Sequence, residues 1–268
     1  MEPSSITTSR AAEAWRVVAR VTDPELDEPV TEMGFVERID IGDDGSVELD
    51  FRLPTYWCSP NFAFLMLDGV REALESLSWR PRFRITLHDH LFADEVNKGV
   101  AAGKRFQEIF DSLSPDQDLS ALRRKFLEKA FQKRQEAAFL GLRDAGWADD
   151  DILALDCAAL DRANVGPELT VRLARYREAM RARFSHFCAG SPAFVAWNGT
   201  PLQASELSAY LAALRAVRIN MEFNGALCRR LKQTRYWEKP ASSDELTLTD
   251  FIADSSTRCA GKSVSTQR

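Results

Sequence analysis

One short turn holds the residue types best suited to chemistry. Residues 53–60, LPTYWCSP, connect a strand-like segment to an amphipathic helix, and they contain Cys58, the only cysteine among the first 156 residues. Pro60 suits the first turn of the following helix, which places Cys58 at or just before a helix N-terminus. The free backbone N–H groups at such an end favour the thiolate form of cysteine. A thiolate can bind a metal ion or attack an electrophile.

Two of the three histidines are placed where they could join this thiol. Residues 81–88, PRFRITLH, alternate as a strand, and the helix-containing connection 54–80 is long enough for a crossover between parallel strands. The two strands would then end at one sheet edge, with Cys58 beside His88 and His90. The histidines are two residues apart, so they share a face while the strand lasts. Cysteine, histidine and carboxylate side chains are ligands of zinc and iron, so one hypothesis is that Cys58, His88 and His90 bind a metal ion. The alternative is that the His-Asp-His run is a solvated strand end, since a single cysteine makes a weak metal site.

The elements that must position this turn follow from periodicity. A helical pattern begins at Ser9, where Thr8 or Ser9 can cap it, and ends before a proline. The acidic segment 22–33 is typical of a solvated loop. Residues 34–41 and 46–53 alternate on either side of an Asp-Asp-Gly turn, which predicts a β-hairpin with one buried face.

The second half of the chain is predominantly helical in its pattern. A polar hinge at 112–120 separates it from the first half, and an Asn198-Gly199 turn follows a segment that could form a short strand. The predicted class is α+β: a small α/β domain (helix, β-hairpin, helix, strand, helix) followed by a mostly helical domain. The predicted divisions are a flexible N-terminus at 1–8, the α/β domain at 9–111, the helical domain at 118–239 and a disordered tail at 240–268.

One face of the predicted helix at 119–142 is basic. Its cationic residues are Arg123, Arg124, Lys125, Lys129, Lys133 and Arg134. Such a face could dock an acidic partner, or it could be a solvated face with acidic neighbours. The spacing of Cys157, Cys188 and Cys228 fits no metal motif, and we interpret them as small core residues. Cys259, near the end of the chain, is expected to be incidental.

Composition excludes several classes of protein. The formal net charge of −5 argues against nucleic-acid binding, and no run of 18 apolar residues predicts a membrane span. The N-terminus has no apolar signal core, and five widely spaced cysteines make a poor disulfide framework, so we expect reduced thiols in the cytoplasm. Phosphate-binding glycine loops and the GxSxG and HExxH motifs are absent from the sequence.

Several short motifs in order resemble a known family. They are Asp23-Pro24-Glu25-Leu26, Gly34-Phe35-Val36, the turn at 43–45, and Pro54-Thr55-Tyr56 before Cys58. Over roughly residues 10–100 the chain resembles PaaD-type and SufT-type domains of metal–sulfur cluster assembly. The resemblance implies a compact α/β domain that helps to assemble or deliver iron–sulfur clusters. It also implies that Cys58 is the functional residue, with Asp23, Glu25 and Thr55 in support.

The sequence also departs from that family. Ser59 separates the cysteine from the proline that normally follows it, and Trp57 replaces a small residue before it. The run HDHLFADEVN replaces an apolar, tryptophan-containing segment after the third strand. These changes favour a specialised client, and because PaaD-type members are associated with oxygenase systems, maturation of a metal-dependent oxygenase is an attractive hypothesis by analogy.

Three functional hypotheses result. The first is a non-enzymatic accessory factor in which Cys58 holds iron or an iron–sulfur cluster transiently, while a homodimer or a client metalloenzyme supplies the remaining ligands. The second is an adaptor or chaperone whose helical half binds an oxygenase subunit or a chaperonin without handling metal. The third is an enzyme with Cys58 as nucleophile and His88 or His90 as base.

Overall fold

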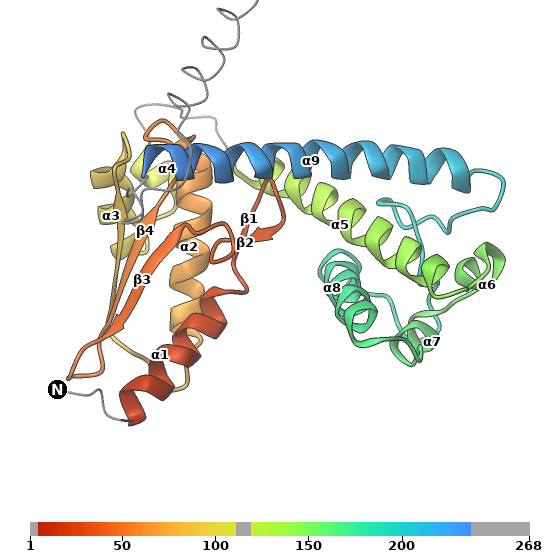
Figure 1. The fold of residues 1–268 in the computed structure, drawn as a ribbon, viewed down its shortest axis with the longest axis horizontal. Coiled ribbons are helices and arrows are strands. Elements are labelled where there is room, and N and C mark those ends of the chain that lie inside the picture. Colours follow the sequence, from red (N-terminus) through yellow and green to blue (C-terminus); the bar gives the residue numbers. More distant parts are fainter. Residues whose placement is uncertain (1–4, 111–118, 237–268) are drawn as a thin grey trace, which may run out of the picture. The chain divides into compact units, whose positions relative to one another are not determined.

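The computed structural model describes residues 5–110 and 119–236 (Figure 1). The chain has the predicted α+β architecture, with a small mixed sheet and its helices followed by a helical region. The predicted hinge residues 112–118, the tail at 240–268 and Cys259 lie outside the described residues. The division into domains therefore stays a prediction, although the described residues up to Arg235 cluster as one compact unit.

The helices and strands follow one another with short connections. In the first half they are α1 (Ser5–Val18), β1 (Thr22–Asp23), β2 (Glu28–Pro29), β3 (Val36–Ile41), β4 (Val47–Arg52), α2 (Pro60–Glu75), β5 (Phe83–His88), α3 (Ala93–Ala101) and α4 (Phe106–Ile109). In the second half they are α5 (Leu119–Asp144), α6 (Asp149–Leu153), α7 (Cys157–Asp161), α8 (Pro167–Arg183) and α9 (Leu207–Arg235).

The three-stranded sheet confirms the predicted topology. Its order is β3-β4-β5, with β3 antiparallel to β4 and β4 parallel to β5. Gly45 closes the hairpin at a φ of 78°, a conformation that glycine adopts without steric cost. Alternate residues of β4, including Leu49 and Phe51, are buried in the first hydrophobic cluster beneath α2. The parallel pairing brings the ends of β4 and β5 to one sheet edge, where Arg52 pairs with His88.

Three local predictions differ from the structure. Helix α1 begins at Ser5, so Thr8 and Ser9 lie inside the helix instead of capping it. The helical pattern after Leu91 is broken into α3 and α4, because Gly103 takes a φ of 62° between them. The predicted strand before the Asn198-Gly199 turn is reduced to an isolated bridge between Val195 and Pro201.

A second hydrophobic cluster lies among α5, α8 and the N-terminal half of α9. At its centre is Gln135, a fully buried amide whose Nε2 donates to the Val195 carbonyl at 2.7 Å. The Gln135 side chain also bonds the hydroxyls of Tyr176 and Tyr210. Burial of a polar side chain is tolerated here because its donors and acceptors have partners.

The acidic loop and the basic face of α5 pair with each other. The prediction of a solvated loop at 22–33 is wrong: Asp27 is buried, with 2% of its side chain exposed, and its two oxygens accept from Arg134 at 2.7 and 2.9 Å. Lys133 donates to the Leu26 carbonyl at 2.9 Å. Lys133 and Arg134 of the basic face therefore have partners in the acidic loop. This agrees with the interpretation that the face has acidic neighbours within the chain.

The buried pair predicts a stability change. Replacing Asp27→Asn keeps the side-chain shape and the tolerance for its positive φ of 52°, but it removes the buried counter-charge of the largely buried Arg134 guanidinium and leaves only the more distant, exposed Glu178. We expect the free energy of unfolding to fall by about 3–5 kcal/mol, measured by urea denaturation. The control is Asp40→Asn, which removes one half of an exposed pair with Arg38 and should leave stability nearly unchanged. Equal losses in the two variants would contradict this role of Asp27.

Candidate functional site

The turn that carries Cys58 is fixed by local hydrogen bonds. Pro60 opens α2, as the sequence predicts, and Ser59 precedes it at the N-cap position without a capping side-chain hydrogen bond. The Cys58 thiol is half-buried against the first hydrophobic cluster, and its Sγ lies 3.1 Å from the hydroxyl of the buried Thr55. Thr55, the threonine predicted to support the site, is therefore in direct contact with the Cys58 thiol.

His90 holds the turn through the backbone of Cys58, not through its sulfur. Its Nδ1 accepts from the Phe92 N–H at 3.2 Å, so its Nε2 carries the proton and donates to the Cys58 carbonyl at 2.8 Å. Burial lowers the pKa of His90 and keeps the ring neutral. Both ring nitrogens are thus engaged, which leaves neither free to bind metal or to act as a base toward Cys58.

His88 does not share a face with His90. Strand β5 ends at His88 and Asp89 has a φ of 50°, so the alternation that would place both histidines on one face stops between them. His88 Nε2 bonds Asp50 Oδ1 at 2.8 Å, and Arg38 bonds the other oxygen at 2.7 Å. Burial opposes ionisation of Asp50, but these two hydrogen bonds outweigh it and hold its pKa below the ordinary value.

The predicted three-ligand set of Cys58, His88 and His90 is therefore not assembled within the chain. Throughout residues 5–110 and 119–236, no three His, Cys, Asp or Glu side chains are grouped so that they could hold a metal ion. The sequence correctly places the ends of β4 and β5 together, since the Leu91 N–H donates to the Tyr56 carbonyl at 2.8 Å. The strand topology brings the ends of β4 and β5 together, but the side chains of Cys58, His88 and His90 point in different directions.

Asp23 is a buried carboxyl in the acidic loop. Its Oδ1 accepts from the N–H groups of Glu25 and Leu26 at 2.8 and 3.0 Å, which fixes the loop geometry. Burial raises its pKa to about 6, even though those two hydrogen bonds act in the opposite direction. Glu25 contacts Asp23 through its backbone N–H, and its negative charge also acts to raise the pKa of Asp23.

Helix α9 supplies residues that sequence reasoning did not place at the site. Lys232 donates to the Arg52 carbonyl at 3.2 Å, and the Arg235 guanidinium donates to the Asp89 carbonyl at 3.0 Å while lying over the Tyr56 ring. One turn before Lys232, Cys228 packs against the same cluster as Cys58. Burial raises the pKa of Cys228 to about 11, and electrostatic interaction with nearby Asp23 adds to the effect.

The spacing of these α9 residues in the sequence already indicated that they lie on one face of the helix. Residues 228, 232 and 235 are four and three apart, so they share one side of a helix. The sequence does not state what that side covers, because the contact joins residues about 180 positions apart. The interpretation of Cys228 as a small packed residue is confirmed, but the core it joins is that of the first half.

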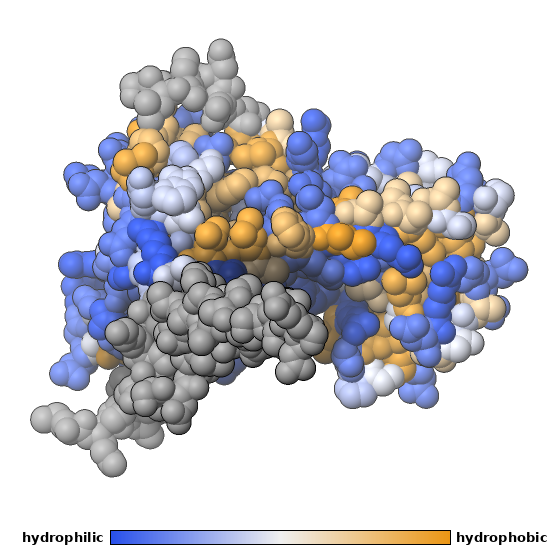
Figure 2. Space-filling model, turned by 45° about the horizontal axis from the view of Figure 1, so that its top comes forward, coloured by the Kyte–Doolittle hydropathy of each residue, from blue (hydrophilic) through white to orange (hydrophobic). Residues whose placement is uncertain are grey.

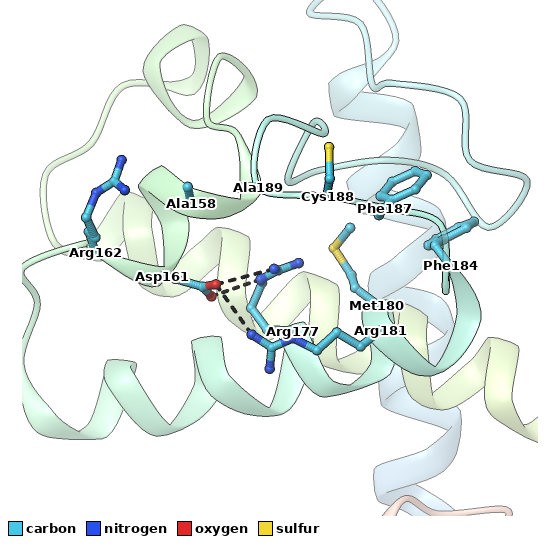
Figure 3. Close-up of a pocket in the computed structure, with 10 residues that line it drawn as sticks. All are labelled: Ala158, Asp161, Arg162, Arg177, Met180, Arg181, Phe184, Phe187, Cys188 and Ala189. Carbon is cyan, nitrogen blue, oxygen red and sulfur yellow. Dashed lines mark hydrogen bonds and ion pairs between the residues drawn. The ribbon is translucent and has the colours of Figure 1, made fainter.

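A second thiol lies in a pocket of the helical region. Cys188 lines a cavity of about 370 Å³ together with Met180, Phe184 and Phe187 (Figure 3). Asp161 on α7 faces Arg177 and Arg181 on α8 in the same pocket. Cys188 is exposed, which corrects its interpretation as a core residue, whereas Cys157 is fully buried as expected.

Comparison with known proteins agrees with the geometry of the first half. Residues 11–82 match the family model described as iron-sulfur cluster assembly protein. The matched segment contains Asp23, Thr55 and Cys58, and it ends before His88 and before all of the helical region. No curated protein matches the chain. The family match confirms the resemblance and supports a general role in iron–sulfur cluster assembly.

The raised pKa of Asp23 predicts a pH dependence of stability. Between pH 3.8 and about 6 the folded protein holds a proton on Asp23 that the unfolded chain has released, so this contribution to stability is lost as pH rises through about 6. The difference corresponds to about 3 kcal/mol. The variant Asp23→Asn cannot titrate here, so its free energy of unfolding should rise relative to the unsubstituted chain by about that amount over this window. A constant difference across the window would show that the Asp23 pKa is ordinary.

The thiols should also differ in reactivity. Hydrogen bonds from the Ser191 hydroxyl and the Gly190 N–H lower the pKa of the exposed Cys188, whereas burial raises that of Cys228. At a pH of about 8, roughly one Cys228 thiol in a thousand is ionised. Iodoacetamide should therefore modify Cys188 well before Cys228 in the native protein, as followed by peptide mass spectrometry. In urea the two rates should converge, and equal rates in the native state would refute the ordering.

Proposed function

We propose that this protein is an accessory factor that binds iron or an iron–sulfur cluster transiently through Cys58 and passes it to a client metalloenzyme in the cytoplasm. The observation that carries the proposal is the Cys58 thiol beside Thr55 at the start of α2, within the segment that matches the iron–sulfur cluster assembly family. Iron is a substrate in this scheme and not a resident cofactor.

The geometry of the turn suits transient binding. One thiolate fills a single position of a tetrahedral site, so the remaining ligands come from a partner or a client. The hydroxyl of Thr55 can hydrogen-bond the sulfur and orient it, as outer groups commonly do for metal ligands. Tyr56 and Trp57 next to Cys58 are 49% and 65% exposed, and such aromatic side chains are frequent anchors in protein interfaces. Together they favour contact with a protein at the same turn.

The hydrogen bonds of His90 count against a nucleophilic enzyme. A base for Cys58 would need a ring nitrogen free to take the thiol proton. In this structure Nδ1 of His90 already accepts, and its Nε2–H donates to a carbonyl. His88 is engaged with Asp50. An adaptor that binds a client through the helical region remains the second candidate, and the client in either case is proposed to be a metal-dependent enzyme such as an oxygenase.

The test is iron and acid-labile sulfide bound per chain after anaerobic loading with ferrous iron and sulfide. The unsubstituted chain should bind both, and Cys58→Ser should lose them. Cys188→Ser, at an exposed thiol outside the matched segment, is the matched control and should load normally. Thr55→Val keeps the side-chain shape and should weaken iron binding by about tenfold.

A cluster-transfer experiment distinguishes the assembly role from the adaptor role. Loaded protein is mixed with an apo iron–sulfur protein, and cluster formation on the acceptor is followed by absorbance. Loading and transfer that depend on Cys58 support the assembly role. Normal maturation of a client by Cys58→Ser would contradict that role and favour the adaptor.

A further inference from the structure

The packed side of helix α9 carries a second thiol toward the core that holds the Cys58 turn. Met221, Gly225, Cys228 and Lys232 recur at spacings of four, three and four, and each is buried or partly buried. The exposed apolar residues of the helix lie on another side, where Figure 2 shows an apolar band along it. Cys228 therefore packs inward, against the hydrophobic cluster of the first half of the chain.

Contacts on the same side of α9 fix the helix against the Cys58 turn. Lys232, one helical turn after Cys228, donates to the carbonyl of Arg52, the last residue of the strand that leads into the turn. Arg235 lies over the ring of the tyrosine two residues before Cys58. The part of α9 that begins at Cys228 therefore covers the chain segment that ends at Cys58.

Cys58 and Cys228 are neighbours within this contact. Both are free, partly buried thiols, and both pack against the same hydrophobic cluster. The thiol of Cys228 also interacts electrostatically with Asp23 and Cys58, so that ionisation of Cys58 would oppose ionisation of Cys228. Such interactions fade over about 10 Å in salt solution, so the electrostatics agree with the packing in placing these groups close together.

The buried carboxyl of Asp23 suits this place to a cation. Asp23 is 7% exposed, and both hydrogen bonds that its side chain accepts go to Oδ1, from the N–H groups of Glu25 and Leu26. Its Oδ2 accepts no hydrogen bond from the residues that the structure describes. A buried carboxylate is costly unless a positive charge compensates it. A metal ion bound next to Asp23 would supply that charge.

We propose that Cys228 is the second thiol ligand of the iron or iron–sulfur cargo at the Cys58 turn. The inference rests on the proposed function of Cys58 and adds a residue from outside the segment that matches the assembly family. Thiolate ligands favour iron and zinc over magnesium and calcium. Each thiol gives up its proton when the ion binds and regains one when the ion leaves.

Two thiolates from one chain agree with transient binding. They fill two of the four positions of a tetrahedral site, and a client supplies the other two. The described residues contain no group of three His, Cys, Asp or Glu side chains that could hold a metal ion, so a two-thiol site stays open to a client. The helical region thereby completes the site, because α9 contributes a ligand that the family segment lacks.

Cobalt(II) serves as the probe for the number of thiolate ligands, because each bond from sulfur to cobalt adds to a charge-transfer band in the near ultraviolet. The reduced full chain is titrated with cobalt(II) without oxygen, and the band is measured per bound ion. Cys228→Ser and Cys58→Ser should each lose about half of the band, since each removes one of two thiolates, and the double variant should lose all of it. Cys188→Ser, at an exposed thiol, is the matched control and should keep the full band.

The pattern of losses distinguishes this inference from the proposed function. A full band in Cys228→Ser, together with complete loss in Cys58→Ser, would overturn the role of Cys228 and leave that of Cys58. A full band in Cys58→Ser, or no band in the unsubstituted chain, would overturn both.

Cross-linking tests the proximity of the two thiols in the unsubstituted chain, so it does not depend on how a variant folds. Dibromobimane joins two thiols that lie close together and becomes fluorescent only after both have reacted. Peptide mass spectrometry should find Cys58 joined to Cys228, and saturating cobalt(II) should suppress this link. Absence of the link, or a link that forms equally well with cobalt(II) bound, would overturn the shared site.

Discussion

The buried pair of Asp27 and Arg134 is the contact on which the rest of the arrangement depends. It lies in an acidic loop that also receives Arg175 of α8 and Arg229 of α9. The loop comes from the segment that matches the assembly family, and the cations come from three helices that the match does not include. Because a buried carboxylate needs a partner, the first half of the chain holds Asp27 at low cost only with the helical region attached.

The same attachment changes the surroundings of the Cys58 turn. Strands β4 and β5 bring the turn and the segment after β5 together, and His90 fastens them through the Cys58 carbonyl. Helix α9 then lays Cys228, Lys232 and Arg235 along this edge. The family segment builds the surroundings of the Cys58 thiol from local residues. In this chain they are also bordered by α9, which begins about 120 residues after that segment ends.

Local patterns were reliable where neighbours in sequence are also neighbours in space. The hairpin and the start of α2 at Pro60 depend on alternation and on a turn signal. The contact of Thr55 with Cys58 agrees with what the family resemblance implies. The predicted shared face of His88 and His90 does not form, for a reason of the same kind. Alternation predicts a shared face only while the strand continues, and the positive φ of Asp89 ends it between His88 and His90.

The sequence by itself determined the α+β class, the crossover that places two strand ends together and the thiol at a helix start, because each depends on periodicity or on nearby residues. Only the tertiary structure decided that the acidic loop is buried against α5, that His90 is a structural hydrogen-bonding residue, and that α9 covers the edge beside Cys58. Charge patterns show that Asp27 and Arg134 need partners, but a separation of 107 residues in the chain gives no indication of which ones they find. The tertiary structure decides the pairing, because packing α5 against the loop gives the Leu26 carbonyl, the Asp27 carboxylate and the Arg134 guanidinium hydrogen-bond partners together.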